Sequence, residues 1–99
     1  MVGIDPATGA LMGSTISEQT RQAVANCRAV LVAAGADLSD VVEVGVLLTD
    51  SADFDGLIEE YTQWFGVGSG VDPPARYVAR LGVTLPDVLV SIRLTACSG

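Results

Sequence analysis

Two segments with helical periodicity flank a single β-branched segment, and this order limits the folds that the chain can adopt. Apolar residues recur at helical spacing in residues 16–34 and again in residues 54–65. Residues 41–49 between them read VVEVGVLLT, which is typical of a strand. Two further strands are predicted at residues 75–84 and 88–96. This order predicts an α+β fold with a mixed sheet that is covered on one face by two helices.

The first predicted helix has clear start and stop signals. Thr15 and Glu18 fit a capping box, in which the two side chains satisfy early amide donors. Gly35 suits the left-handed position that often follows a helix. We expect the buried stripe to contain Ala23, Val24, Cys27, Val30, Leu31 and Ala34, and the other faces to carry Gln19, Arg21, Gln22 and Arg28.

The second predicted helix has Asp53 as its expected cap and a wide aromatic stripe. The stripe consists of Phe54, Leu57, Ile58, Tyr61, Trp64 and Phe65. Such a stripe belongs to a hydrophobic core far more often than to a cofactor site, and we expect Glu59 and Glu60 on the solvated face. The glycine-rich residues 66–70 lack the preceding strand and following helix that a phosphate-binding loop requires.

The predicted strand at residues 41–49 is apolar on both faces to different degrees. Alternation places Val42, Val44, Val46 and Leu48 on one face, and Val41, Glu43, Gly45 and Leu47 on the other. The second face is mixed rather than polar, which indicates that it is partly covered, for example by another subunit. Before the first helix, residues 5–9 (DPATG) predict a turn.

Charge and missing residue types narrow the chemistry. Twelve acidic residues against five arginines give a net charge of −7, and the chain has no lysine and no histidine. Nucleic-acid binding needs clustered positive charge and is therefore not expected. The same absences exclude Ser-His and Cys-His nucleophile pairs, histidine-ligated metals, lysine Schiff bases and Walker-type phosphate loops.

Length and hydropathy indicate one domain over residues 1–99. The longest uncharged apolar run, residues 29–36, is far shorter than the ~20 residues that a membrane span needs. The first ten residues lack the features of a secretory signal, so we expect a soluble, cytoplasmic protein without a membrane partner. Cys27 and Cys97 are too few for a metal site or a disulfide framework, and Cys27 is expected in the core.

Arg76 is the candidate binding residue by position. It follows Pro73, Pro74 and Ala75 and opens a strand of mostly neutral residues, so it leaves a rigid turn. A guanidinium placed there can hold a carboxylate through two parallel hydrogen bonds. On composition alone, a surface ion pair with one of the twelve acids is favoured for Arg76, and it is also the expectation for Arg80 and Arg93.

Several segments, in order along almost the whole chain, resemble the RidA/YjgF family. They are Asp5–Gly9, Gln19–Cys27, Ala33–Gly35, Leu38–Val42, Leu48–Phe54, the helix end at Tyr61–Phe65, Pro74–Arg76 and the closing strand. The family is described as reactive-intermediate deaminases, and also as L-PSP endoribonucleases or translation inhibitors. The resemblance implies a chorismate-mutase-like fold and a homotrimer, whose sheets form a central barrel with three clefts between neighbouring subunits.

The resemblance also implies a reaction and a site. Family members hydrolyse enamines and imines, such as 2-aminoacrylate, to 2-keto acids and ammonia, with no metal and no organic cofactor. The arginine that binds the substrate carboxylate corresponds to Arg76 through its Pro-Ala-Arg context. Three other cleft positions depart from the family pattern: Val78 replaces a frequent cysteine, Ser91 a water-positioning glutamate and Ile58 a frequent asparagine. A serine can hold water, but it cannot act as a carboxylate base.

The N-terminus departs from the family as well. Family members begin with a two-stranded segment that carries a tyrosine and a Ser-Gly backbone site of the cleft, and this chain starts after it. Loss of those strands would expose a sheet edge. Because Val2–Ile4 look like the end of a longer strand, we expect the true start to lie upstream of Met1. Residues 1–99 are thus interpreted as a single RidA-like domain, truncated at its N-terminus relative to the family.

Three functional hypotheses follow. In the first, the chain is a RidA-like deaminase of carboxylate-bearing imines, with Arg76 holding the carboxylate, Ser91 placing water, and Val78 and Ile58 lining the substrate site. In the second, a non-catalytic trimer binds a small carboxylate metabolite through Arg76. The third, an endoribonuclease, ranks last because the chain lacks the ordinary RNA-cleaving groups.

Overall fold

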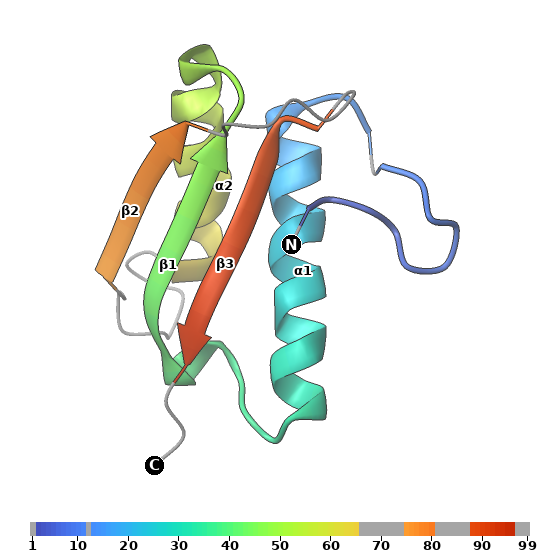
Figure 1. Ribbon diagram of the computed structural model, residues 1–99, viewed down its shortest axis with the longest axis vertical. Coiled ribbons are helices and arrows are strands. Elements are labelled where there is room, and N and C mark those ends of the chain that lie inside the picture. Colours follow the sequence, from blue (N-terminus) through green and yellow to red (C-terminus); the bar gives the residue numbers. More distant parts are fainter. Residues whose placement is uncertain (1, 12, 66–74, 81–87, 97–99) are drawn as a thin grey trace.

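The computed structural model describes residues 2–11, 13–65, 75–80 and 88–96, and in these it confirms the α+β prediction. Its elements are α1 (Ile16–Ala33), β1 (Val41–Leu48), α2 (Phe54–Phe65), β2 (Ala75–Arg80) and β3 (Val90–Ala96), with short 3₁₀ turns η1 (Leu38–Asp40) and η2 (Ser51–Asp53). The strands form a mixed sheet in the order β2-β1-β3, in which β1 is parallel to β2 and antiparallel to β3. Both helices lie on one face of this sheet (Figure 1).

Helix α1 begins and ends where its signals predict. The Thr15 hydroxyl accepts a hydrogen bond from the Glu18 backbone N–H at 3.2 Å and donates one to the Glu18 carboxylate at 2.8 Å. The cap therefore satisfies one early amide of the helix, and the two side chains hold each other in place. After the helix, Gly35 has a φ of +83°, the left-handed conformation that glycine adopts without strain.

The buried stripe of α1 is shifted towards the start of the helix relative to the prediction. Ala23, Val24 and Cys27 are buried as expected, but Val30 is 54% exposed and Gln19, predicted on an outer face, is fully buried. The Gln19 amide is satisfied from both sides, since its Nε2 donates to the Gly13 carbonyl and its Oε1 accepts from the Leu89 N–H at 2.8 Å. The N-terminal segment also packs on this helix, because Gly3 is buried directly against the Gln19 backbone.

The N-terminal segment forms the predicted turn. The Asp5 carboxylate accepts from the Ala7 N–H at 2.9 Å, the Gly9 N–H donates to the Asp5 carbonyl at 2.7 Å, and Ile4 bridges Leu11. Asn26 of α1 donates to the carbonyls of Val2 and Ile4 at 3.0 and 2.7 Å, so the turn is attached to the helix. Within the described residues, no helix is long and apolar enough to cross a bilayer.

Strand β1 does not keep the strict alternation predicted for it. A register shift against β3 occurs between Val41 and Glu43, so that the strand carries a bulge at its start. The buried, helix-facing set is therefore Val41, Val44, Val46 and Leu48, whereas Val42 is more than half exposed on the open face. The assignment of Val42 to the buried face and of Val41 to the open face was wrong for this reason.

The two helices are joined by an ion pair that the sequence analysis did not predict. Glu60, expected on a solvated face, is 3% exposed, and its carboxylate accepts from Arg21 Nε at 3.1 Å and Nη2 at 3.4 Å. This hydrogen-bonded carboxylate raises the pKa of the Arg21 guanidinium above its ordinary value. The cap expected from Asp53 is also placed differently, because Asp50 accepts from the Ala52 N–H at the start of η2.

Cys27 lies in the core, as predicted, and this position makes its thiol inert. Burial raises the pKa of the thiol, and its Sγ lies 3.7 Å from the Ile92 carbonyl oxygen, to which it donates. Exposure of the Cys27 thiol requires a local opening of the fold, which we take to cost ~3 kcal/mol. We therefore expect alkylation of Cys27 to be about 10²-fold slower in the folded protein than in urea. Mass spectrometry of the separated peptides measures Cys27 independently of Cys97.

The same thiol predicts a pH dependence of stability. Because its folded-state pKa is raised, the unfolded chain loses the thiol proton first as the pH increases. The free energy of unfolding should therefore decrease above the ordinary thiol pKa, and Cys27→Ala should reduce this decrease. Equal alkylation rates with and without urea would contradict the buried position.

Candidate functional site

Strand β2 carries three candidate residues on the side of the sheet that faces the helices. Arg76, Val78 and Arg80 pair with Val44, Val46 and Leu48 of β1, respectively, and these three partners are all buried beneath the helices. Because partners in register point to the same face of a sheet, both arginines and Val78 lie on the helix side. β2 is an edge of the described sheet, so the two arginine side chains remain exposed.

Arg76 is supported by the ring of Tyr61. The Arg76 guanidinium carbon lies 5.1 Å from the ring centroid, which is within the range of a cation–π interaction. Tyr61 is buried, and this burial raises the pKa of its hydroxyl, although the charge of Arg76 opposes the shift. Among the described residues, no carboxylate forms an ion pair with Arg76, so the expected surface ion pair is not observed there.

Helix α2 provides the opposite wall. Phe54, Ile58 and Tyr61 are spaced at i, i+4 and i+7 and therefore form one stripe along the helix. Tyr61 lies under Arg76 at one end of this stripe, and Phe54 lines a pocket with Val78 at the other end. Half-buried Ile58 lies between them on this helical stripe. We call the space between these two rows the β2–α2 groove, formed by Arg76, Val78, Arg80, Phe54, Ile58 and Tyr61.

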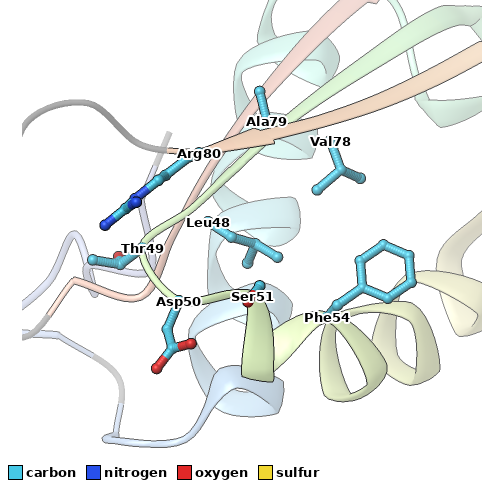
Figure 2. Close-up of a pocket in the computed structure, with 8 residues that line it drawn as sticks. All are labelled: Leu48, Thr49, Asp50, Ser51, Phe54, Val78, Ala79 and Arg80. Atoms are coloured by element: carbon cyan, nitrogen blue, oxygen red, sulfur yellow. The ribbon is translucent and has the colours of Figure 1, made fainter.

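A pocket of about 890 Å³ occupies the Arg80 end of the β2–α2 groove. Its described lining consists of Leu48, Thr49, Asp50, Ser51, Phe54, Val78, Ala79 and Arg80. Figure 2 shows Phe54 and Val78 pointing towards each other, with Leu48 between them and the Arg80 guanidinium at the far end. The pocket thus combines an apolar wall with a polar end that carries the Arg80 guanidinium and the Asp50 carboxylate. The acidic residue in this lining, Asp50, uses a carboxylate oxygen to cap η2.

Ser91 is separated from the groove. It pairs with Leu47 in β1, and its neighbours Val90 and Ile92 are buried beneath the helices. Ser91 therefore lies on the open face, which also exposes Val42 and Tyr77. Arg76 and Val78 share the helix side of β2, and Ile58 lies on the α2 stripe that includes Tyr61 and Phe54, whereas Ser91 lies on the opposite face of the sheet.

Three groove residues were not recognised as site residues in the sequence. Phe54 and Tyr61 were assigned to the core, and Tyr61 is indeed buried while it also supports Arg76. Arg80 was expected in a surface ion pair, but the described residues contain no such pair for it. The period-two spacing of Arg76, Val78 and Arg80 in one strand could have revealed the shared face.

These features define a class of protein: an α+β domain with two helices on one face of a mixed sheet and a cationic groove at the sheet edge. The family model described as Endoribonuclease L-PSP matches residues 1–98. The chain therefore belongs to the RidA/YjgF (L-PSP) family, as its sequence segments predicted, and it has the fold of that family.

Named relatives and solved structures agree with this assignment. RutC family protein PH0854 of Pyrococcus horikoshii is 39% identical over 95 residues, covering 96% of this chain and 72% of that protein. Human 2-iminobutanoate/2-iminopropanoate deaminase is 41% identical over 64 residues, which cover 65% of this chain and 47% of the deaminase. The structure of E. coli TdcF with bound serine superposes with a TM-score of 0.88 at 28% identity, covering 99% of this chain and 76% of TdcF.

Proposed function

We propose that this chain is a deaminase that hydrolyses carboxylate-bearing 2-imino acids to 2-keto acids and ammonia. The observation that carries the proposal is Arg76, whose guanidinium rests on Tyr61 and is not paired with any described carboxylate. A guanidinium held in this way can form a bidentate pair with the substrate carboxylate. Relatives named as imine deaminases, including the human protein, support this reading.

The reaction requires few protein groups. Water adds to C2 of the imine, the former imine nitrogen takes up protons, and the C–N bond of the resulting carbinolamine breaks to release ammonia and the 2-keto acid. Arg76 would hold the C1 carboxylate throughout and so fix the position of C2 against the attacking water. Val78, Ile58 and Phe54 would enclose the substrate carbon chain in the β2–α2 groove.

Completion of this site requires a neighbouring subunit. We propose the homotrimer that the family resemblance implies, in which neighbours cover the open face with its exposed Val42 and Tyr77. Ser91 lies on that face and cannot reach Arg76 of its own chain, so it would place water in the cleft of an adjacent subunit. Its hydroxyl can orient a water molecule by donating or accepting a hydrogen bond.

A binding protein without catalysis is the second candidate. It is favoured by the lack of a free carboxylate that could act as a general base. Asp50 is the one carboxylate among the described residues that line the pocket, and one of its oxygens caps η2. Such a site would bind a small carboxylate metabolite through Arg76 without a base to activate water. An endoribonuclease is less well supported, because the net charge of −7 and the lack of histidine and lysine oppose RNA binding and cleavage.

The test measures imine hydrolysis directly. An amino-acid oxidase generates 2-iminobutanoate in the presence of semicarbazide, which traps the free imine, and the protein is added at increasing concentration. We expect less semicarbazone and faster release of 2-oxobutanoate than in buffer. If protein shown to be trimeric by sedimentation binds 2-oxobutanoate but gives no acceleration, the binding function replaces the deaminase.

A further inference from the structure

We infer that Arg80 is a second anion-binding residue of the β2–α2 groove and that the preferred ligand is a 2-imino or 2-oxo acid with a second carboxylate at the end of its side chain. This inference rests on the proposed function of Arg76. It assigns the Arg76 end to the C1 carboxylate and the Arg80 end to the distal carboxylate.

The spacing of the two arginines along β2 suits a ligand with two carboxylates. Arg76 and Arg80 are four residues apart on one face of β2, which separates their Cα atoms by about 13 Å. A guanidinium and a carboxylate in a bidentate pair have central carbons roughly 4 Å apart. Figure 2 shows the Arg80 guanidinium extending away from Val78, so binding requires this exposed side chain to turn back along the groove. With the two arginine side chains then parallel, about 5 Å remains between the two carboxylate carbons. That length corresponds to a five-carbon dicarboxylate, and flexible arginines accommodate a six-carbon one.

Apolar residues line the space between the Arg76 and Arg80 guanidinium groups. Val78 lies midway between the arginines on the same strand face, and Leu48 and Phe54 complete an apolar wall around it (Figure 2). Methylene groups are favoured in such a lining, and the pocket of about 890 Å³ has room for a side chain that extends from the Arg76 end towards Arg80. Along the groove, the site therefore offers a cation, then an apolar wall, and then a second cation.

Arg80 forms no ion pair within the part of the chain that the structure describes. Asp50 lines the same pocket, but its Oδ1 accepts from the Ala52 N–H at 2.9 Å, and Figure 2 shows its carboxylate pointing away from Phe54. The Thr49 hydroxyl donates to the Val88 carbonyl at 2.7 Å, so it does not compete for the Arg80 guanidinium.

The experiment compares two 2-oxo acids of equal carbon number by calorimetry. We expect wild-type protein to bind 2-oxoglutarate roughly ten- to hundredfold more tightly than 2-oxopentanoate, the range expected for one charged hydrogen-bonded pair. In Arg80→Gln this ratio should fall to near one, and Arg80→Lys should restore part of it. Arg28→Gln should retain the wild-type ratio, because Arg28 pairs with Asp37 outside the groove.

The outcomes separate this inference from the proposed function. Equal binding of the two acids by wild type, absence of 2-oxoglutarate binding, or a preference that persists in Arg80→Gln would each overturn the inference. A preference that depends on Arg80, without acceleration of imine hydrolysis, would support the dicarboxylate site and reject the deaminase. If imine hydrolysis also occurs, 2-iminoglutarate made by glutamate oxidase should be favoured over 2-iminopentanoate, with a ratio that falls in Arg80→Gln.

Discussion

Replacing Arg76 with glutamine is expected to reduce kcat/KM for 2-iminobutanoate hydrolysis by roughly 10- to 10²-fold, the range for losing one charged hydrogen-bonded pair. The reason is that glutamine keeps a hydrogen-bond donor but removes the charge and the two parallel N–H groups that a carboxylate requires. Because the carboxylate persists through the reaction, the loss should appear mainly as a higher KM. Steady-state kinetics with the semicarbazide trap measures both constants.

The matched control for Arg76 is another exposed arginine. Arg28 forms an ion pair with Asp37 at 3.0 Å and lies outside the groove, so Arg28→Gln removes the same charge without touching the site. If the two variants lose activity equally, the effect reflects net charge or folding, and Arg76 has no specific role. Circular dichroism and sedimentation should show both variants folded to the same extent as wild type.

Truncating Phe65 to alanine is expected to lower the free energy of unfolding by about 3–5 kcal/mol, the cost of removing a fully buried aromatic side chain. Phe65 is 1% exposed, and its ring centroid lies 5.0 Å from that of Tyr61. Phe54 is the matched control, since it lies on the same helix but is 40% exposed at the pocket wall. Phe54→Ala should cost less than about 1.5 kcal/mol.

Urea denaturation at a fixed protein concentration measures both phenylalanine variants, because subunit association would make stability depend on concentration. An unchanged m-value together with a lower midpoint identifies a true loss of stability. If Phe65→Ala and Phe54→Ala lower the free energy of unfolding by the same amount, the core is not organised around the Tyr61–Phe65 pair. Phe54→Ala should instead alter ligand binding, since Phe54 forms the pocket wall.

The features of the fold that depend on local sequence were predictable. The Thr15 cap and the Gly35 stop follow from short-range spacing, and the structure confirms them. The predicted stripe of α2 is confirmed in part, since Leu57, Tyr61 and Phe65 are buried but Phe54 is 40% exposed. Burial that depends on distant segments was not predictable. Gln19 is buried because Gly3, Gly13 and Leu89 meet it, and Val42 is exposed because a bulge against β3 interrupts the alternation.

The candidate site was predictable only in part for the same reason. The family resemblance singled out Arg76, Val78 and Ile58; the structure places Arg76 and Val78 on the helix side of β2, and the role of all three stays a prediction. The role of Tyr61 as a support for Arg76 depends on the packing of α2 against β2, which no local pattern encodes. The position of Ser91 on the open face depends on the pairing of β3 with β1, and its role in catalysis stays a prediction.

The β2–α2 groove belongs to a single strand–helix–strand unit, in which β1 leads through α2 to the parallel strand β2. Every described residue of the groove and its pocket lies between Leu48 and Arg80, so neither α1 nor β3 contributes to it. The residues proposed to bind the two ends of a ligand therefore lie in one contiguous stretch of sequence. If the proposed site is correct, exchange of this stretch between family members should transfer ligand preference, while β3 carries Ser91 on the opposite face of the sheet.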